Sequence, residues 1–280
     1  SRNTPDSQDS LTRSSRTRRG DVAEMDCTKC KDLGYVTMPD GEYARARTCD
    51  ACRAVCPICR GSGLMIDATE LPVRAVPCSC ASLNNRISLF NMARIPGRMH
   101  EKTLDRFEEN SAGQATVKLF MKRFIDDYRP GNRGFMLWGR PGTGKTHLVC
   151  AMARYFLLER GYTVRFVDFF QLLSDLKAGF GENRPESDLI MPLLAPDVLI
   201  IDELGKGRAT EWEVSVLDQL ISRRYNAGKT VIATTNFDPN KASDQGGMPG
   251  LISRIDDRIY SRLCEMCEFI EVAGDDYRKH

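Results

Sequence analysis

Hydrophobic residues in the second half of the chain fall into short apolar runs, and these are separated by segments with helical spacing. The runs predict strands at residues 134–138, 162–167, 197–202, 230–235 and 268–272. The segments between them predict helices at residues 145–160, 169–178, 210–226 and 250–264. Apolar strands that alternate with helices are typical of a parallel sheet covered on both faces. The pattern therefore predicts an α/β domain over residues 134–280.

The first half of the chain has a different pattern. Residues 1–25 contain almost no large apolar residues and predict a disordered tail. Residues 26–82 are rich in cysteine and predict a small zinc-binding domain. Residues 83–133 predict a linker that contains a helix near 114–128. A chain of 280 residues is long enough for one domain of ordinary size and such a module.

Composition narrows the class of protein. A hydrophobic fraction of 41% supports a packed core, and no apolar run reaches the length of a membrane span. The N-terminal residues lack the apolar stretch of a signal peptide, so we expect a cytoplasmic protein. Because the net charge is only +2, nucleic-acid binding would depend on local patches. Lys177, Lys206 and Arg208 are candidates for such a patch, although scattered basic residues more often serve solubility.

A phosphate-binding loop follows the first predicted strand. The pattern G-x-x-x-x-G-K-[ST] is complete, with a strand before it and a helix after it. Backbone N–H groups and a helix N-terminus then converge on one point, which suits a polyphosphate. Lys145 is expected to reach the β- and γ-phosphates, and the Thr146 hydroxyl to ligate Mg²⁺. The predicted nucleotide-binding residues of this loop are Gly139, Arg140, Pro141, Gly142, Thr143, Gly144, Lys145 and Thr146.

Polar side chains end two later strands. An Asp-Glu pair such as Asp202-Glu203 is commonly a helix cap or a turn, but here it follows an apolar strand at the edge where ligands bind in open α/β sheets. We expect Asp202 to hold Mg²⁺ and Glu203 to act as the base that polarises the attacking water. Asn236 is a candidate for positioning that water, although an Asn before a loop is often only a turn residue. Together these residues predict ATP hydrolysis.

The cysteines form an internal repeat. Pairs that begin at Cys27 and Cys49 recur 29 residues later, apart from a one-residue deletion within the last pair. Without an export signal, such thiols are expected to bind metal and not to form disulfides. Four thiolates suit a closed, tetrahedral, structural Zn²⁺ site. The eight residues that predict two zinc sites are Cys27, Cys30, Cys49, Cys52, Cys56, Cys59, Cys78 and Cys80.

The pairing of these cysteines stays open at this point. The sites can be sequential, with the first four cysteines in one site and the last four in the other. They can also interleave, joining the first pair to the last, as in the DnaJ zinc domain, whose C-x-x-C-x-G-x-G motif resembles Cys56 to Gly63. So short a segment cannot build a core, and metal is expected to supply about 10 kcal/mol of folding energy per site.

Three arginines lie four residues apart on the predicted C-terminal helix: Arg254, Arg258 and Arg262. The simplest interpretation is a solvated basic stripe that is partly paired with Asp256 and Asp257. In ATPases that assemble head to tail, however, an arginine of one subunit completes the site of its neighbour.

With these motifs, residues 134–278 resemble the DnaC/DnaI/IstB branch of the AAA+ ATPases, the bacterial helicase loaders and transposition helpers. The resemblance rests on Gly139–Leu148, Asp197–Gly205, Ile221–Tyr225, Thr234–Asn236, Asp257–Leu263 and Gly274–Arg278, and more weakly on Ile95-Pro96 and Leu104–Phe107. It implies a P-loop sheet in the order 5-1-4-3-2, ATP with Mg²⁺, and self-association into a ring or helical array. It also implies a trans-acting arginine at Arg258 or Arg262. Because the chain ends soon after the fifth strand, we expect the helical lid to be missing, with Arg278 as a substitute for the lid arginine.

Three functions agree with this sequence. The first is a helicase loader, whose cysteine module docks on a replicative helicase while its ATPase module self-associates and grips single-stranded DNA during replication. The second is a transposition helper that acts with a transposase on duplex DNA, which ranks lower because such helpers usually carry a helical N-terminal region. The third is a nucleotide-gated protein adaptor, and the intact Glu203 argues against it. We therefore expect an ATP-hydrolysing helicase loader.

Overall fold

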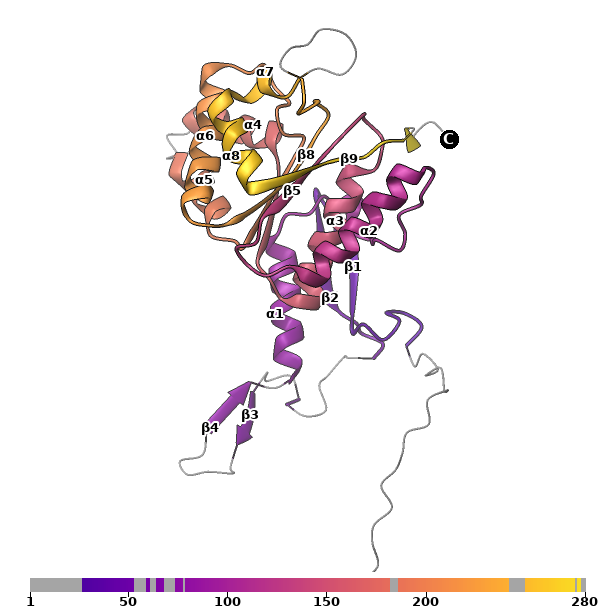
Figure 1. Ribbon diagram of the computed structural model, residues 1–280. Coiled ribbons are helices and arrows are strands. Elements are labelled where there is room, and N and C mark those ends of the chain that lie inside the picture. The colour runs from indigo at the N-terminus through magenta and orange to yellow at the C-terminus, as the bar shows by residue number, and fades with distance from the viewer. Residues whose placement is uncertain are drawn as a thin grey trace, which may run out of the picture.

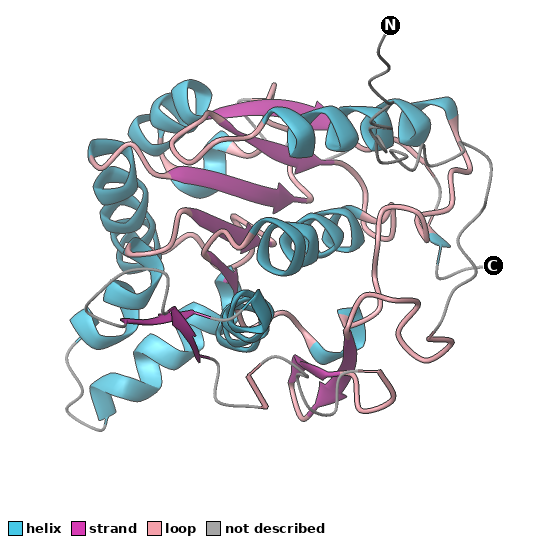
Figure 2. Cartoon of the chain, turned by 90° about the horizontal axis from the view of Figure 1, so that it is seen from below, coloured by secondary structure: helices cyan, strands magenta, loops and turns pink. Residues whose placement is uncertain are grey.

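The computed structural model describes residues 27–52, 59–60, 64–67, 74–77, 79–181, 186–241, 250–274 and 276–277. Its centre is a sheet of five parallel strands (Figures 1 and 2). The strands are β5 (Gly134–Trp138), β6 (Val164–Asp168), β7 (Val198–Asp202), β8 (Thr230–Thr235) and β9 (Cys267–Glu271). Their order is β9-β5-β8-β7-β6, which confirms the expected order 5-1-4-3-2.

Helices cover both faces of the sheet. On one face, Phe135 and Leu137 of β5 share a core with α1 (Ser79–Met92), α2 (Ala112–Asp127) and α3 (Lys145–Tyr155). On the other face, Met136 shares a core with the remaining helices: α4 (Phe169–Gly181), α5 (Glu186–Leu194), α6 (Glu211–Asn226), α7 (Ile252–Ile255) and α8 (Asp257–Met266). Because helices cover both faces, the three central strands are almost fully buried, and β5 and β7 are nearly continuous apolar runs. The edge strands β6 and β9 also carry charged residues that are at least partly exposed.

Three helical features differ from the prediction. The helix expected over 145–160 changes to π geometry at Phe156–Arg160 (η2). The helix expected over 250–264 breaks into α7 and α8, because Asp256 has φ of 76° and its carboxylate accepts a hydrogen bond from the Arg258 N–H at 2.7 Å. Helix α5 was not predicted. Within the described residues, no helix or strand follows β9.

The cysteine-rich region contains two antiparallel hairpins. The first joins β1 (Tyr35–Asp40) to β2 (Tyr43–Thr48), and the second joins β3 (Leu64–Asp67) to β4 (Arg74–Pro77). Tyr35 pairs with Thr48, and 29 residues later Leu64 pairs with Pro77. The same offset holds for every other pair of the second hairpin. This register confirms that the sequence repeat is two copies of one hairpin.

The two hairpins have different surroundings. Tyr35, Ala44 and Ala46 of the first hairpin belong to the same buried core as α1, α2 and α3. This hairpin is therefore built into the α/β core, although it falls within the region predicted as a separate domain. The second hairpin lies beyond the far end of α1, away from the sheet (Figure 1), and its Leu64 is 53% exposed.

No helix in the described part of the chain is long and apolar enough to cross a membrane.

Candidate functional site

The phosphate-binding loop joins β5 to α3, as the sequence predicts. Gly144 caps the N-terminus of α3 with φ of 93°, a left-handed conformation that favours glycine. A Cβ atom at Gly144 would also lie 2.5 Å from the ring of Phe107. Glycine therefore lets the loop turn into α3 and pack closely at the same time. The backbone N–H groups of the first turn of α3 are left to bind an anion.

Lys145 is buried inside this loop. Its Nζ atom donates hydrogen bonds to the carbonyl oxygens of Gly139 at 2.8 Å and of Arg140 at 2.7 Å. The Thr143 hydroxyl also donates to the Arg140 carbonyl, at 3.1 Å. These bonds curve the loop around the ammonium group. Phosphate oxygens are stronger acceptors than carbonyls, so a nucleotide can take over the ammonium hydrogens.

Asp202, at the end of β7, faces the first turn of α3. The Thr146 hydroxyl lies 3.0 Å from both Asp202 carboxylate oxygens, and the Thr234 hydroxyl lies 2.5 Å from one of them. Burial raises the pKa of Asp202, and the hydrogen bonds from Thr234 and Thr146 oppose that rise. A carboxylate and a hydroxyl are ligands that Mg²⁺ prefers, and a cation here would offset the cost of the buried charge. Thr146 and Asp202 therefore fit the predicted magnesium site.

Glu203 follows directly, with φ of 57°. Its N–H donates to the Thr234 hydroxyl oxygen at 3.0 Å, and its carboxylate accepts a hydrogen bond from Lys206. Thr234 therefore binds both acidic residues, because its hydroxyl donates to Asp202 and accepts from Glu203. In the sequence, Thr234 stands out only as a neighbour of Asn236. Its role depends on β8 lying beside β7, which no local pattern reveals.

A cavity of about 420 Å³ lies over the phosphate loop. Glu203 and Asn236 line it together with loop residues, so the structure brings these predicted groups to one place. A second wall comes from residues 95–107, which we call the lead-in segment, and its lining side chains include Arg98 and Phe107. The sequence does not predict this wall, and its only signal there is the weak family resemblance of the lead-in segment.

Tyr277 and His147 complete the cavity. Tyr277 belongs to the closing motif noted in the sequence, and its N–H donates to the Gly142 carbonyl at 3.2 Å. The His147 ring lies edge-on to Phe107, and its Nε2 atom is 2.9 Å from the Thr103 carbonyl oxygen. Burial lowers the pKa of His147, which favours the neutral ring. Arg278, the proposed substitute for a lid arginine, lies outside the described residues.

Arg258 and Arg262 do not line this cavity. Both approach Asp218 of α6, with Nη1 of Arg262 at 2.7 Å and Nη1 of Arg258 at 4.0 Å from its carboxylate. Arg262 is largely buried in this ion pair, whereas Arg258 is mostly exposed. Within one chain, therefore, neither arginine completes the nucleotide site, and Arg258 is the freer of the two.

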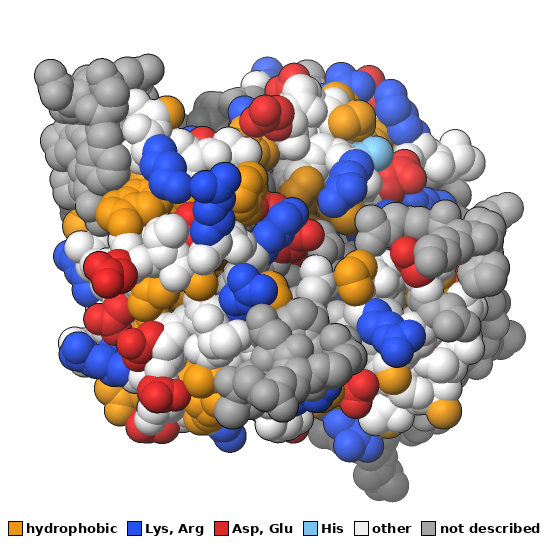
Figure 3. All heavy atoms as spheres, turned by 90° about the horizontal axis from the view of Figure 1, so that it is seen from above, with side chains coloured by type: hydrophobic (Ala, Val, Ile, Leu, Met, Phe, Trp, Pro, Cys, Tyr) orange, Lys and Arg blue, Asp and Glu red, His pale blue; other side chains and the backbone are white. Residues whose placement is uncertain are grey.

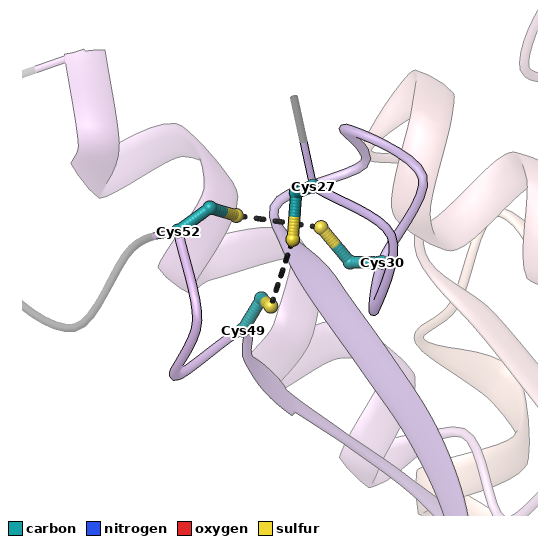
Figure 4. A group of neighbouring side chains, drawn as sticks. All are labelled: Cys27, Cys30, Cys49 and Cys52. Atoms are coloured by element: carbon teal, nitrogen blue, oxygen red, sulfur yellow. Dashed lines mark hydrogen bonds between the residues drawn. The ribbon is translucent and has the colours of Figure 1, made fainter. Parts of the chain in front are cut away.

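The first four cysteines form one cluster (Figure 4). The sulfur atoms of Cys27, Cys30, Cys49 and Cys52 all lie within 4.8 Å of one another. The Cys27–Cys49 and Cys30–Cys52 sulfur distances are 3.8 and 3.4 Å, close to the roughly 3.8 Å edge of a tetrahedron with 2.3 Å Zn–S bonds. The cluster fits a structural zinc ion and supports the sequential pairing over the interleaved one.

The second predicted zinc site cannot be compared in the same way. Cys56 and Cys78 lie outside the described residues, and the side chain of Cys80 is not described. Cys59 is buried. Its neighbour Arg60 has φ of 51°, equal to that of Lys31 at the matching position of the first copy. The backbone repeat thus extends into the second cysteine turn.

Comparisons with known proteins agree with this geometry. A family model described as IstB-like ATP binding protein matches residues 83–280. The replicative helicase loader DnaC of Buchnera aphidicola subsp. Acyrthosiphon pisum is 26% identical over 193 residues, which cover 66% of this chain and 74% of that protein. The phage-like element PBSX protein XkdC of Bacillus subtilis is 27% identical over 258 residues, which cover 88% of this chain and 81% of that protein. The XkdC match therefore extends into the cysteine-rich half.

Solved structures give the same picture. The crystal structure of the DnaC helicase loader superposes with a TM-score of 0.55 at 27% identity, covering 63% of this chain and 99% of that one. The crystal structure of DnaI, at 22% identity and a TM-score of 0.51, supports the fold alone. The fold of the α/β domain thus has counterparts among these AAA+ proteins.

Proposed function

The chain belongs to the family of IstB-like ATP-binding proteins, and on this premise we propose that it is a Mg²⁺-dependent ATPase that loads a replicative helicase onto single-stranded DNA. The observation that carries the ATPase proposal is the contact between Thr146 of the phosphate loop and Asp202, with Glu203 beside them. This contact joins the nucleotide-binding loop to the acidic strand that hydrolysis requires.

Each residue has a distinct task in this mechanism. Lys145 and the N–H groups of α3 bind the β- and γ-phosphates. Thr146 and Asp202 would hold Mg²⁺, which would supply positive charge beside the phosphate oxygens. Glu203 accepts a proton from the attacking water, and Asn236 orients that water from the neighbouring strand. For Glu203 to act, its carboxylate must leave Lys206 and turn toward the γ-phosphate.

A Glu203→Gln variant tests the ATPase proposal. We expect it to bind ATP with unchanged affinity and to lose turnover by about 10²-fold or more, because the amide cannot accept the proton. Glu211→Gln is the matched control, since Glu211 is an exposed acid that does not line the cavity. An unchanged rate in Glu203→Gln would favour a nucleotide-gated adaptor instead.

Self-association is part of the proposal, because neither Arg258 nor Arg262 lines the nucleotide cavity of its own chain. Arg258 is the better candidate to enter a neighbour's site, since Arg262 is committed to Asp218. An arginine supplied in trans typically accelerates phosphoryl transfer by about 10³–10⁵-fold. The assignment therefore predicts that turnover rises with protein concentration.

A surface of mixed aromatic and basic character supports DNA binding. Phe170 is half-exposed, and Lys206 Nζ lies 5.7 Å from its ring centroid. Lys177 Nζ lies 4.9 Å from the Trp212 ring centroid in the same way. On the face seen in Figure 3, Lys and Arg side chains lie beside hydrophobic ones. Single strands bind such surfaces because bases stack on the rings and phosphates pair with the cations.

The second hairpin supports binding to a protein partner. Tyr35 of the first hairpin is 4% exposed against the core, whereas Leu64, its counterpart in the second copy, is 53% exposed. At this position, the face that docks in the first copy is exposed in the second. We propose that this face, held by a second zinc site, contacts the replicative helicase. Leu64→Glu should abolish copurification with the helicase, while Leu119→Glu, an equally exposed leucine on α2, should not.

DNA preference separates loading from transposition. A loader should bind single-stranded DNA more tightly than duplex DNA at fixed salt, and single strands should raise its ATPase rate. Duplex preference, together with copurification of a transposase, would favour the transposition helper. Salt must be matched in both measurements, since phosphate contacts make affinity depend on it.

A further inference from the structure

The tip of the first hairpin is bonded to the lead-in segment. The Ala44 N–H donates to the Ile95 carbonyl at 2.7 Å, and the Gly97 N–H donates to the Glu42 carbonyl at 2.8 Å. A Cβ atom at Gly97 would lie 3.1 Å from the Gly41 carbonyl oxygen, so the two backbones touch. The next residue, Arg98, lines the nucleotide cavity. One wall of that cavity therefore rests directly on the hairpin.

The stem of the same hairpin is bonded to the end of the phosphate-loop helix. Tyr35 Oη donates to Glu159 at 2.7 Å. Arg154 Nη1 donates to the Thr37 hydroxyl and to the His100 carbonyl, both at 2.8 Å. Arg154 lies on α3, which begins at Lys145, and Glu159 lies in the π turn that continues α3. The hairpin thus braces both the lead-in wall and the helix that carries the phosphate-binding residues.

The cysteine cluster closes the base of this hairpin. Cys27 and Cys30 precede β1, while Cys49 and Cys52 follow β2, so a metal ion here ties the two strand ends together. The Cys49 N–H donates to the Gly34 carbonyl at 2.9 Å. Without the metal, only strand pairing and the docking contacts would hold so short a hairpin in place.

We propose that metal binding at the first cysteine cluster and nucleotide binding at the phosphate loop are thermodynamically linked, with the first hairpin as the connecting element. The proposal rests on the ATP-binding function proposed above. A metal that orders the hairpin also orders Arg98 and α3, so nucleotide binds a site that is already arranged. Because linkage is reciprocal, bound nucleotide must raise the affinity for the metal by the same factor by which bound metal raises the affinity for the nucleotide. Arg154 acts as a positioning residue, since it joins the hairpin to α3.

The repeat supplies an internal control. Cys59 occupies the position in the second copy that Cys30 occupies in the first, and the second hairpin stands apart from the core (Figure 1). Cys30→Ser and Cys59→Ser in the full, zinc-loaded chain should each lower the bound zinc. Only Cys30→Ser should weaken the affinity for a fluorescent, non-hydrolysable ATP analogue, by about tenfold, a typical size for coupling between sites. Equal affinities in the two variants would overturn the linkage.

A second measurement uses the unaltered chain, so it decides the question even if Cys30→Ser fails to fold. Zinc release to a chromophoric chelator is followed with and without the Mg²⁺–ATP analogue. The analogue should slow release of one zinc equivalent by about tenfold, and Arg154→Ala should lose this protection while keeping its zinc. Arg154→Lys should partly restore it. Identical release curves would refute the linkage alone, whereas failure of the unaltered chain to bind the analogue would refute the proposed function.

Discussion

Replacement of Thr234 by valine removes one hydroxyl that bonds both to the Asp202 carboxylate and to the Glu203 backbone. In the native chain this hydroxyl donates to Asp202 at 2.5 Å and accepts from the Glu203 N–H at 3.0 Å. Valine has nearly the same shape, and Thr234 is only 1% exposed although it borders the nucleotide cavity, so water replaces the lost bonds poorly. The variant therefore leaves a buried carboxylate oxygen and a backbone N–H without these partners.

The expected losses of stability and of kcat both follow from these two hydrogen bonds. A hydrogen bond to a charged group contributes about 1.5–3 kcal/mol, and an unsatisfied buried N–H costs about 1–3 kcal/mol. Part of this loss is relieved by relaxation, so we expect destabilisation of about 2–4 kcal/mol. That corresponds to a fall in Tm of roughly 5–15 °C for a domain of this size. If the carboxylate bond also holds in the transition state, kcat falls about 10–100-fold.

Thr235→Val is the matched control. Thr235 is equally buried, and its hydroxyl donates to the Leu204 carbonyl at 2.8 Å and accepts from the Phe237 N–H at 3.2 Å. It should lower Tm by a similar amount without a comparable loss of kcat, because neither partner is a catalytic group. Thermal unfolding and steady-state ATP hydrolysis measure both quantities, and Thr234→Ser should stay near the native values. Equal kcat losses in the two valine variants would refute the role assigned to Thr234.

Three further predictions concern the site and its partners. Burial raises the pKa of Asp202, so the ionised carboxylate lowers the stability of the metal-free protein near pH 7. Asp202→Asn should therefore raise the Tm of the metal-free protein, and this gain should shrink as the pH falls through the pKa of Asp202. The same variant should lose ATPase activity by about 10²-fold. A lower Tm at pH 7 would contradict this account. Arg258→Ala and Lys145→Ala should each be inactive, yet regain activity when mixed if Arg258 acts in trans; no recovery would exclude it. Phe170→Ala should weaken single-strand binding by about 1–3 kcal/mol with an unchanged salt slope, and a changed slope would argue against stacking.

The sheet and the phosphate loop could be predicted because their signals are local. Apolar runs of strand length, glycines at a helix start and acidic residues at a strand end each lie within a few positions of one another. The break at Asp256 and the π turn at Phe156–Arg160 were missed because both keep an uninterrupted helical pattern of apolar residues. Helical periodicity alone cannot distinguish one long helix from two short ones at an angle.

The remaining features that the sequence did not predict have one physical cause, which is contact between segments far apart in sequence. Thr234 gains its role only when β8 lies beside β7, and Phe107 only when the lead-in segment meets the phosphate loop. The docking of the first hairpin was missed for the same reason. Its alternating apolar positions, such as Ala44 and Ala46, are small, and nothing along the chain says what covers them.

The divergence of the two hairpins bears on the proposed loading function. One copy is bonded to the lead-in segment and to the phosphate-loop helix, and the other lies at the far end of α1 with its Leu64 exposed. Arg86 of α1 donates to the Leu158 carbonyl in the π turn at 2.8 Å, so α1 is itself anchored beside the phosphate-loop helix. Under the proposed function, a partner bound to the second hairpin would be connected through α1 to the nucleotide-binding element. Duplication would then give the chain one hairpin that supports the nucleotide site and one that contacts the partner, joined through α1.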